Sequence, residues 1–317
     1  MFAFSAKRRI EKYLAKHPEV KTIVVTGGTG RKSSIRALGM ILGQQYVVTM
    51  GINKDVEADV VILDYKSSAD FPDIDPDVVI ITSARTDEEA QRFFSVANRA
   101  KHVLLNFNEV PQKFAKYLKN PHIKTYGDEL PADFYYENND FSLDGYTGDF
   151  IDEERDRLHV EIKILGEHNI RPIIMACAVG KLFKIHRDKL TAGCESIVPL
   201  HGRMSPAKGI GGTIVIDDSA YISADSVRLG INTICALQAP AKTLVIDDAT
   251  KVDGVNLEPL TDICVLGNTS GVDPRNKKVH YFEEEVDLIH HLGERAEKGG
   301  IILLEIPLPE IIESYIW

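Results

Sequence analysis

The 317-residue sequence lacks an excess of basic charge and lacks long apolar runs. Its formal net charge of −10 at pH 7, with no basic stripe, argues against nucleic acid as a main partner. No run approaches the ~18 apolar residues that cross a bilayer. The apolar start at residues 1–4 is too short for a secretory signal. We therefore expect a cytoplasmic protein with no membrane span.

Paired cysteine motifs are also missing. The four cysteines form no C-x-x-C pair, and Cys177, Cys235 and Cys264 lie in short apolar runs. Buried, reduced thiols therefore explain them better than a zinc site does. An apolar content of 44% with 26% charged residues is ordinary for a soluble globular protein. The length favours two domains over one compact core.

The sequence near the N-terminus has the pattern of a phosphate-binding loop. A β-branched run at 22–25 predicts a buried strand, Thr-Gly-Gly-Thr-Gly-Arg-Lys-Ser-Ser follows at 26–34, and helical apolar spacing occupies 35–42. Glycines allow backbone N–H groups to surround phosphate oxygens, and a helix N-terminus adds partial positive charge. The strict G-x-x-x-x-G-K-[ST] pattern fails at Thr26 and Arg31, where it requires glycine. A glycine-rich turn before a helix is the alternative interpretation.

Strand candidates alternate with helical segments in two blocks. The candidates are residues 22–25, 58–64, 78–82 and 102–106 in the first block, and 213–216, 243–246, 262–266 and 301–304 in the second. This alternation predicts α/β architecture with parallel sheets and a ligand site at the carboxyl ends of the strands. The boundary falls near residues 199–212, which hold four glycines and two prolines. A long apolar helix is expected over residues 166–185.

Several polar residues stand where ligands bind in such folds, and each has an ordinary explanation as well. Asp64 ends an apolar strand, where it can hold Mg²⁺ or serve as a simple strand-end acid. Asn169 opens a helix and reads alone as an N-cap. Arg203 lies in the interdomain stretch as a candidate phosphate cation or a surface residue. Asp217 ends a strand of the second block, where its carboxylate can accept hydrogen bonds from ribose hydroxyls or can simply form a turn.

Seven segments resemble, in order, the Mur ligase family of ATP-dependent amide ligases, whose relatives make folyl-polyglutamate and poly-γ-glutamate. Residues 25–34 resemble the family's V-T-G-T-N-G-K-T-S and, with Arg and Gly exchanged, the G-T-R-G-K-S-S of poly-γ-glutamate synthases. The other matches are residues 63–68 with E-V-S-S, 82–88 with T-N-x-x-x-D-H, 105–109 with L-N-A-D-D, 166–169 with G-x-H-N, 202–204 with G-R-M, and 216–226 with I-D-D-S-Y-N-A-N-P-D-S.

The resemblance implies a P-loop ATPase domain of parallel-sheet type at residues 1–200 and a smaller Rossmann-like domain at 201–317, with ATP between them. It assigns phosphate contacts to Gly28, Thr29, Gly30, Arg31, Lys32, Ser33 and Ser34. It assigns Mg²⁺ to Ser33, Asp64 and Glu88, the last at the position of the family's histidine. It assigns further nucleotide contacts to His168, Asn169, Arg203 and Asp217, of which Asn169 meets adenine and Asp217 the ribose.

The resemblance also implies a reaction. A substrate carboxylate attacks the γ-phosphate of ATP, and an amine then displaces phosphate from the acyl phosphate. Lys32 and Arg203 are the residues expected to act on the reacting phosphate, because such chemistry rests on positioning and charge neutralisation. Glu305 stands where the family has the lysine of K-G-S. The family's peptidoglycan ligases carry an N-terminal domain that binds the UDP-sugar, whereas here only about 20 residues precede the first strand. A protein partner that supplies such a substrate domain is therefore one expectation.

Three functions follow from these residues. The first is an ATP- and Mg²⁺-dependent carboxylate–amine ligase acting on a small molecule or peptide. The second is a divergent nucleotide-binding or ATPase subunit of a larger complex that does not ligate, which Glu305 favours. The third is a scaffold without a nucleotide site, in which Arg31 fills the phosphate position.

Overall fold

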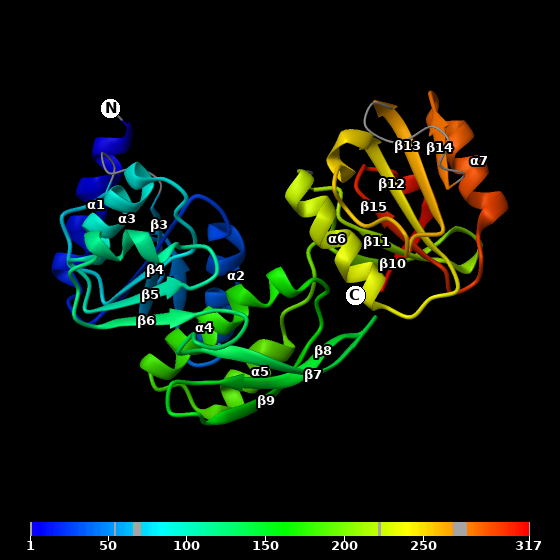
Figure 1. Cartoon of the computed structure of the whole chain (residues 1–317). Coiled ribbons are helices and arrows are strands. Elements are labelled where there is room, and N and C mark those ends of the chain that lie inside the picture. The colour runs from blue at the N-terminus through cyan, green and yellow to red at the C-terminus, as the bar shows by residue number, and fades with distance from the viewer. Residues whose placement is uncertain (1, 54, 66–70, 221–222, 269–277, 317) are drawn as a thin grey trace. The chain divides into compact units, whose positions relative to one another are not determined.

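The computed structural model describes residues 2–53, 55–65, 71–220, 223–268 and 278–316 of the chain, with side chains from Lys7 onward. The chain divides into two compact units (Figure 1). Unit 1 comprises Met1–Asn139, Thr147–Ile162 and Asn169–Ile197. Unit 2 comprises Asp140–Tyr146, Lys163–His168 and Val198–Trp317.

Unit 1 is built on a six-stranded parallel sheet in the order β2-β3-β1-β4-β5-β6. Its strands are β1 (Lys21–Thr26), β2 (Val48–Met50), β3 (Val60–Tyr65), β4 (Val78–Ile81), β5 (His102–Asn106) and β6 (Ile123–Tyr126). Strands β1 and β4 are almost wholly buried, because helices cover both faces and apolar β-branched residues suit such positions. The predicted strands at 22–25, 58–64, 78–82 and 102–106 are confirmed as β1, β3, β4 and β5.

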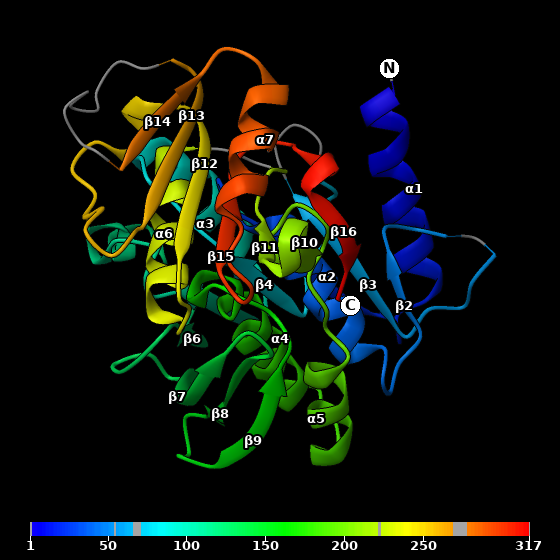
Figure 2. The same ribbon diagram turned by 90° about the vertical axis from the view of Figure 1, so that its right-hand side faces the viewer.

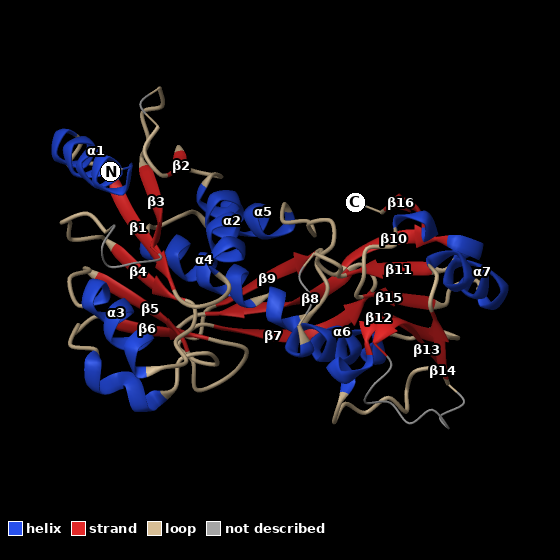
Figure 3. Cartoon of the chain, turned by 90° about the horizontal axis from the view of Figure 1, so that it is seen from above, coloured by secondary structure: helices blue, strands red, loops and turns tan. Residues whose placement is uncertain are grey.

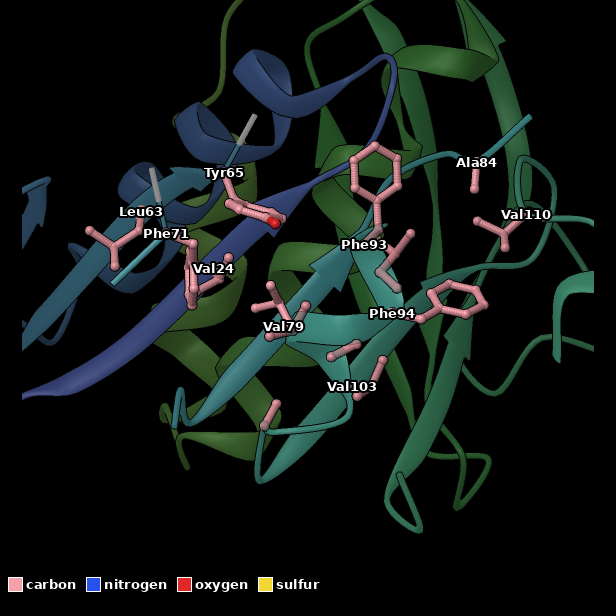
Figure 4. Close-up of a cluster of buried hydrophobic side chains, with 14 of the residues drawn as sticks. Val24, Leu63, Tyr65, Phe71, Val79, Ala84, Phe93, Phe94, Val103 and Val110 are labelled. Atoms are coloured by element: carbon pink, nitrogen blue, oxygen red, sulfur yellow. The ribbon is translucent and has the colours of Figure 1, made fainter. Parts of the chain in front are cut away.

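Helices cover both faces of this sheet (Figure 3). They are α1 (Phe2–Lys16), α2 (Arg31–Leu42), α3 (Asp87–Ala97), α4 (Arg171–Leu182) and α5 (Arg187–Glu195), with the 3₁₀ turns η2 (Gln112–Tyr117) and η3 (Glu167–Asn169). On one face Phe93 and Phe94 of α3 pack on Val24, Val79 and Val103 of the strands (Figure 4). On the other face α2 packs on α4 and α5. The long helix predicted over residues 166–185 is shorter, beginning at Arg171 after a 3₁₀ turn.

A small antiparallel sheet follows in the order β7-β8-β9, formed by β7 (Tyr135–Ser142), β8 (Gly145–Ile151) and β9 (Arg157–Ile162). Strand β9 alternates exposed and buried residues, and its inward face packs on α5. Residues 135–162, which lie between the two predicted blocks of strands, therefore form a separate antiparallel sheet.

Unit 2 is built on a seven-stranded sheet in the order β14-β13-β12-β15-β11-β10-β16. Its strands are β10 (Ser205–Gly209), β11 (Ile214–Asp217), β12 (Lys242–Asp248), β13 (Asp262–Asn268), β14 (Val279–Phe282), β15 (Ile301–Leu304) and β16 (Ile312–Tyr315). Strands β11 to β15 are parallel, whereas β10 runs antiparallel to both of its neighbours. The four strands predicted here are confirmed as β11, β12, β13 and β15.

The two faces of this sheet are covered by different helices (Figure 2). Helix α6 (Ala224–Ala236) packs Val227 and Ile231 into one apolar cluster, and α7 (Glu285–Arg295) packs Leu288 and Leu292 into the other. The remaining turns are η4 (Ile210–Gly212), η5 (Ala249–Val252) and η6 (Pro309–Ile311). Among the described residues, no helix combines the length and the apolar character that a bilayer crossing requires.

Candidate nucleotide-binding site

The glycine loop lies at the point where the strand order of unit 1 reverses. Strand β1 sits between β3 and β4, so the chain runs outward from β1 in both directions. In open α/β sheets, ligands bind beyond the carboxyl ends of the strands at such a point. The loop between β1 and α2 therefore occupies the expected binding edge, together with the ends of β3 and β4.

Two glycines are required by the backbone of this loop. Gly27 has φ 138 and Gly30 has φ 80, conformations that side-chain-bearing residues rarely adopt. A Cβ on Gly27 would also lie 2.7 Å from the backbone nitrogen of Ser83. Gly30 is the last residue before α2, so Arg31 is the first residue of the helix.

Residues after β4 hold the loop from one side. The backbone N–H of Thr29 donates to the Ser83 hydroxyl at 2.9 Å, and the N–H of Gly28 donates to the Ser83 carbonyl at 3.4 Å. The Thr82 hydroxyl donates to the carbonyls of Thr26 and Thr29. The N–H groups of Gly28 and Thr29 are therefore occupied by protein acceptors, and the donors that face no such acceptor include those at the start of α2.

The N-terminus of α2 is positively charged. Arg31 and Lys32 occupy its first turn, which contains no acidic residue and no side-chain cap. Within the described part of the chain, no acceptor contacts the backbone N–H groups of Arg31, Lys32 or Ser33. Cations at a helix N-terminus are unfavourable by about 0.3–1 kcal/mol each. This turn is therefore suited to an anion, and a phosphate oxygen is the expected acceptor.

Arg31 folds back toward the end of β3. Its Nε donates to the Asp64 carboxylate at 2.8 Å, and its Nη1 donates to the Gly27 carbonyl. The two side chains are 20% and 31% exposed, so the pair is worth at most about 1 kcal/mol of stability. The guanidinium lies toward β3, and it leaves the exposed Lys32 at the helix N-terminus.

The residues predicted to hold Mg²⁺ do not form a metal site in this arrangement. Asp64 is engaged by Arg31, and Glu88 is exposed on the first turn of α3. No group of three or more potential carboxylate, histidine or cysteine ligands gathers around a point in the described ranges. A divalent ion about 4 Å from a guanidinium is repelled by about 2 kcal/mol even in water-like dielectric. The donor set as it stands therefore does not fit the ion.

Ser83 and Glu89 are site residues that the sequence did not single out. A Cβ on Gly28 would lie 3.3 Å from the Glu89 Oε1 and 3.3 Å from the Ser83 hydroxyl, so both side chains flank the loop. Glu89 also accepts the backbone N–H of Arg85 at 2.8 Å. The feature of the sequence that could have identified them is the short polar segment directly after β4. Because β4 lies parallel to β1 and next to it, this segment comes close to the loop.

A cavity of about 400 Å³ opens beside Asp64 in unit 1. Apart from Asp64, its lining is mostly apolar and comes from α1, α2, β2 and β3. Residues 66–68, which complete the segment resembling E-V-S-S, lie outside the described residues. Asp64 is therefore accessible from a cavity of the size that holds small organic groups.

In unit 2, the predicted residues Arg203 and Asp217 belong to adjoining segments. Gly202 has φ 71 and a Cβ there would lie 3.0 Å from the Ala220 backbone nitrogen, so the Gly-Arg-Met turn packs on the loop after β11. Arg203 is exposed. The Asp217 carboxylate accepts hydrogen bonds from the Ser219 hydroxyl at 2.6 Å and the Tyr315 hydroxyl at 2.8 Å.

Two buried carboxyls lie at the same edge of unit 2. Burial raises the pKa of Asp218 to about 7, although a hydrogen bond from the Met204 N–H at 3.1 Å and the charge of Arg203 act against this. Burial, together with the neighbouring Asp218 charge, raises the pKa of Glu305 to about 9. Neither oxygen of Glu305 has a hydrogen-bond partner among the described residues. At neutral pH, Glu305 is therefore a neutral acid.

His168 and Asn169 lie together in η3, with His168 counted in unit 2 and Asn169 in unit 1. Helix α4 starts after them, with Ile170 as its N-cap residue. Asn169 is therefore not the N-cap that its position in the sequence suggests. The nucleotide contacts that the resemblance implies for His168 and Asn169 stay predictions.

The fold and the loop define an α/β protein of two units, with a glycine loop at the switch point of a parallel sheet. No protein-family model and no curated protein matches the sequence. Solved structures do match. MurF ligase from Thermotoga maritima in complex with ADP has a TM-score of 0.70 at 13% identity, covering 95% of this chain and 79% of that chain.

Two further solved structures match over similar lengths. MurF from Acinetobacter baumannii has a TM-score of 0.76 at 12% identity, covering 95% of this chain and 76% of that chain. Folylpolyglutamate synthase from Mycobacterium tuberculosis, complexed with ADP and AMPPCP, has a TM-score of 0.65 at 12% identity, covering 96% of each chain. The chain therefore has the fold of the Mur ligases and folylpolyglutamate synthase, and the resemblance is confirmed at the level of the fold.

Proposed function

We propose that the protein is an ATP-dependent carboxylate–amine ligase of the Mur ligase kind. The observation that carries this proposal is the turn at Gly30, where the positively charged start of α2 presents N–H groups without an acceptor in the described chain at the switch point of the sheet. Polyphosphate is the ligand that such a turn suits. Solved relatives of the fold hold ADP and AMPPCP, which supports ATP as the nucleotide.

The proposed reaction uses the chain's own groups for charge and position. The N–H groups of Arg31, Lys32 and Ser33 hold phosphate oxygens, and the ammonium of Lys32 neutralises charge on the transferred phosphoryl group. A substrate carboxylate attacks that group to form an acyl phosphate and ADP, and an amine then displaces phosphate. Arg203 in unit 2 is proposed as a further phosphate contact, Asp217 as the ribose acceptor, and His168 with Asn169 as contacts to the base.

The test is phosphate release by the full chain supplied with ATP, Mg²⁺ and a panel of amino acids and short peptides. The proposal expects release that depends on both a carboxylate and an amine, and that falls by about 10²-fold in Lys32→Ala. Lys101→Ala is the matched control, because Lys101 is an exposed lysine paired with Asp77 before β4, at the amino edge of the same sheet. Equal loss in both variants, or release without any amine, contradicts ligation.

A second function is favoured by a specific observation. Glu305 is a buried neutral acid at a position where the resemblance implies a lysine. Arg31 forms an ion pair with Asp64, the acid that was predicted to bind the metal. A subunit that binds nucleotide without ligating fits both features. Stable ATP binding with no phosphate release across the whole panel would select this function over the first.

A further inference from the structure

Counted from its two required glycines, the loop has a second register beside the one that gives the family's lysine position to Lys32, and in this second register Arg31 takes that position. The left-handed Gly30 directly precedes the helix, and Gly27 is the second glycine that the backbone requires. The spacing Gly27-x-x-Gly30-Arg31 then corresponds to G-T-N-G-K, with arginine in place of lysine. In this second register Lys32 takes the position of a hydroxyl residue and adds a cation beside Arg31, while Ser33 keeps its hydroxyl one position further on.

The positive charge of the Arg31 side chain lies where a bound metal ion would contact oxygen ligands. Its guanidinium joins the Asp64 carboxylate and the Gly27 carbonyl, two oxygens of the kind that Mg²⁺ prefers. A second, weaker contact of 3.5 Å reaches the Gly28 carbonyl. An arginine cannot deprotonate in proteins and presents several donors in a fixed plane, so it carries a permanent positive charge here.

Resting on the proposed nucleotide site, we infer that Arg31 is the built-in counter-ion of this loop and that the phosphates of ATP bind there without a divalent cation. Arg31 balances Asp64, so the acid does not repel the incoming polyphosphate. Lys32 and the first-turn N–H groups of α2 supply the remaining positive charge. The metal is then unnecessary for holding the nucleotide, whatever it contributes to turnover.

The experiment is calorimetric titration of ATP into the full chain, once with excess Mg²⁺ and once with EDTA. The inference expects wild-type Kd values that agree within about twofold between the two buffers. In Arg31→Ala, Asp64 is left as an uncompensated anion, so the Kd in EDTA should rise by about tenfold and recover when Mg²⁺ is added. In Asp64→Asn, Arg31 remains, so binding should stay independent of the metal.

The control is Arg99→Ala, which removes an arginine that pairs with Asp73 at 2.8 Å and Asp75 at 3.0 Å before β4. It should behave as wild type in both buffers. Wild-type binding that weakens about tenfold in EDTA would overturn the inference and leave the nucleotide site standing. The absence of binding in both buffers would instead overturn the proposed function, and the inference with it.

Discussion

The two large sheets differ in the surroundings of an acid that lies at the carboxyl end of a parallel strand. In unit 1, Asp64 lies at a partly exposed edge and is balanced by Arg31 at 2.8 Å. In unit 2, Glu305 is fully buried, and neither of its oxygens has a hydrogen-bond partner in the described chain. An acid that is paired with a cation at an exposed edge leaves that edge available to an anionic ligand, whereas burial raises the pKa of Glu305 even though the charge of Lys251 acts against this.

The carboxyl edges of the two sheets present different chemical groups to a ligand. The edge of unit 1 combines a permanent cation, a helix N-terminus and a cavity beside Asp64. The edge of unit 2 offers hydroxyl and carboxyl groups around Asp217, of which the Asp217 carboxylate is already bonded to Ser219 and Tyr315. We therefore propose that the loop of unit 1 makes the main phosphate contacts, with Arg203 of unit 2 as the further contact proposed above. The following variants test the acids and loops of each edge.

The largest effect is expected for Gly27→Ala. The added Cβ would meet the Ser83 backbone nitrogen at 2.7 Å, and alanine is strained at φ 138. Unit 1 should lose about 3 kcal/mol of unfolding free energy, measured by urea denaturation. Gly51→Ala is the control, because Gly51 has φ 79 with nothing within 4 Å of a Cβ, and should lose only about 1 kcal/mol. Equal losses would show that the close approach to Ser83 is unimportant.

Glu305→Gln tests the edge of unit 2 through pH. Burial raises the pKa of Glu305 to about 9 from its ordinary value of 4.5, so between these values the folded state holds a proton that the unfolded state loses. Stability therefore falls as the pH rises through this window, by up to about 1.4 kcal/mol per pH unit. Glutamine cannot ionise, so the advantage of the variant should grow by about 2 kcal/mol from pH 6 to pH 8.

Denaturation of both proteins at the two pH values measures this difference. Asp218, whose pKa is raised to about 7, titrates in both proteins, and its negative charge is one cause of the raised pKa of Glu305. An advantage that is the same at pH 6 and pH 8 would mean that Glu305 is already ionised in the folded protein. Its edge would then resemble that of unit 1.

Arg171→Ala tests a second charge cluster of unit 1. Arg171 donates to both oxygens of Asp128, at 2.7 and 2.6 Å, and to Glu109 at 2.9 Å. These side chains are 21–33% exposed, much like Arg31 and Asp64, but Arg171 makes three charge-assisted hydrogen bonds to two carboxylates, so the unfolding free energy should fall by about 1.5 kcal/mol. Arg99→Ala breaks only an exposed pair and should change stability by less than about 0.5 kcal/mol in the same denaturation experiment. Similar losses in both variants would contradict the assigned burial.

The smallest effect is expected for Asp64→Asn. The Arg31–Asp64 pair is partly exposed, so its loss should lower the unfolding free energy by less than about 1 kcal/mol. Thermal denaturation of the variant without ligand should therefore remain within a few degrees of wild type. A large drop would mean that the pair supports the fold of unit 1 and is not kept for a ligand.

The sequence predicted the central strands of the two large sheets and missed the outer ones. Strands β1, β4, β11 and β15 are short apolar runs rich in valine, isoleucine and leucine. Because both faces of these strands are buried, their sequences are continuously apolar and do not alternate with polar residues. Strand β10 reads Ser-Pro-Ala-Lys-Gly and β14 is only half-buried, so neither carries that signal. Their pairing depends on neighbours that lie far away in the chain.

The candidate site was predictable in its residue types and not in its contacts. The glycine loop, Asp64 and Asp217 stand at the strand ends where the pattern placed them. The direction of Arg31 depends on Asp64, which lies 33 residues further along the chain. The role of Ser83 follows from the position of β4 next to β1. Such contacts exist only once the strand order is known.

Hydrogen exchange at the loop tests the central claim most directly. Full chain is compared with and without saturating ATP, and exchange is followed at the backbone amides of residues 30–33 and, as an internal reference, at those of β12. If the start of α2 holds the phosphates, exchange at 30–33 slows markedly on ATP addition while β12 is unchanged. ATP that binds without slowing exchange at 30–33 would contradict the account.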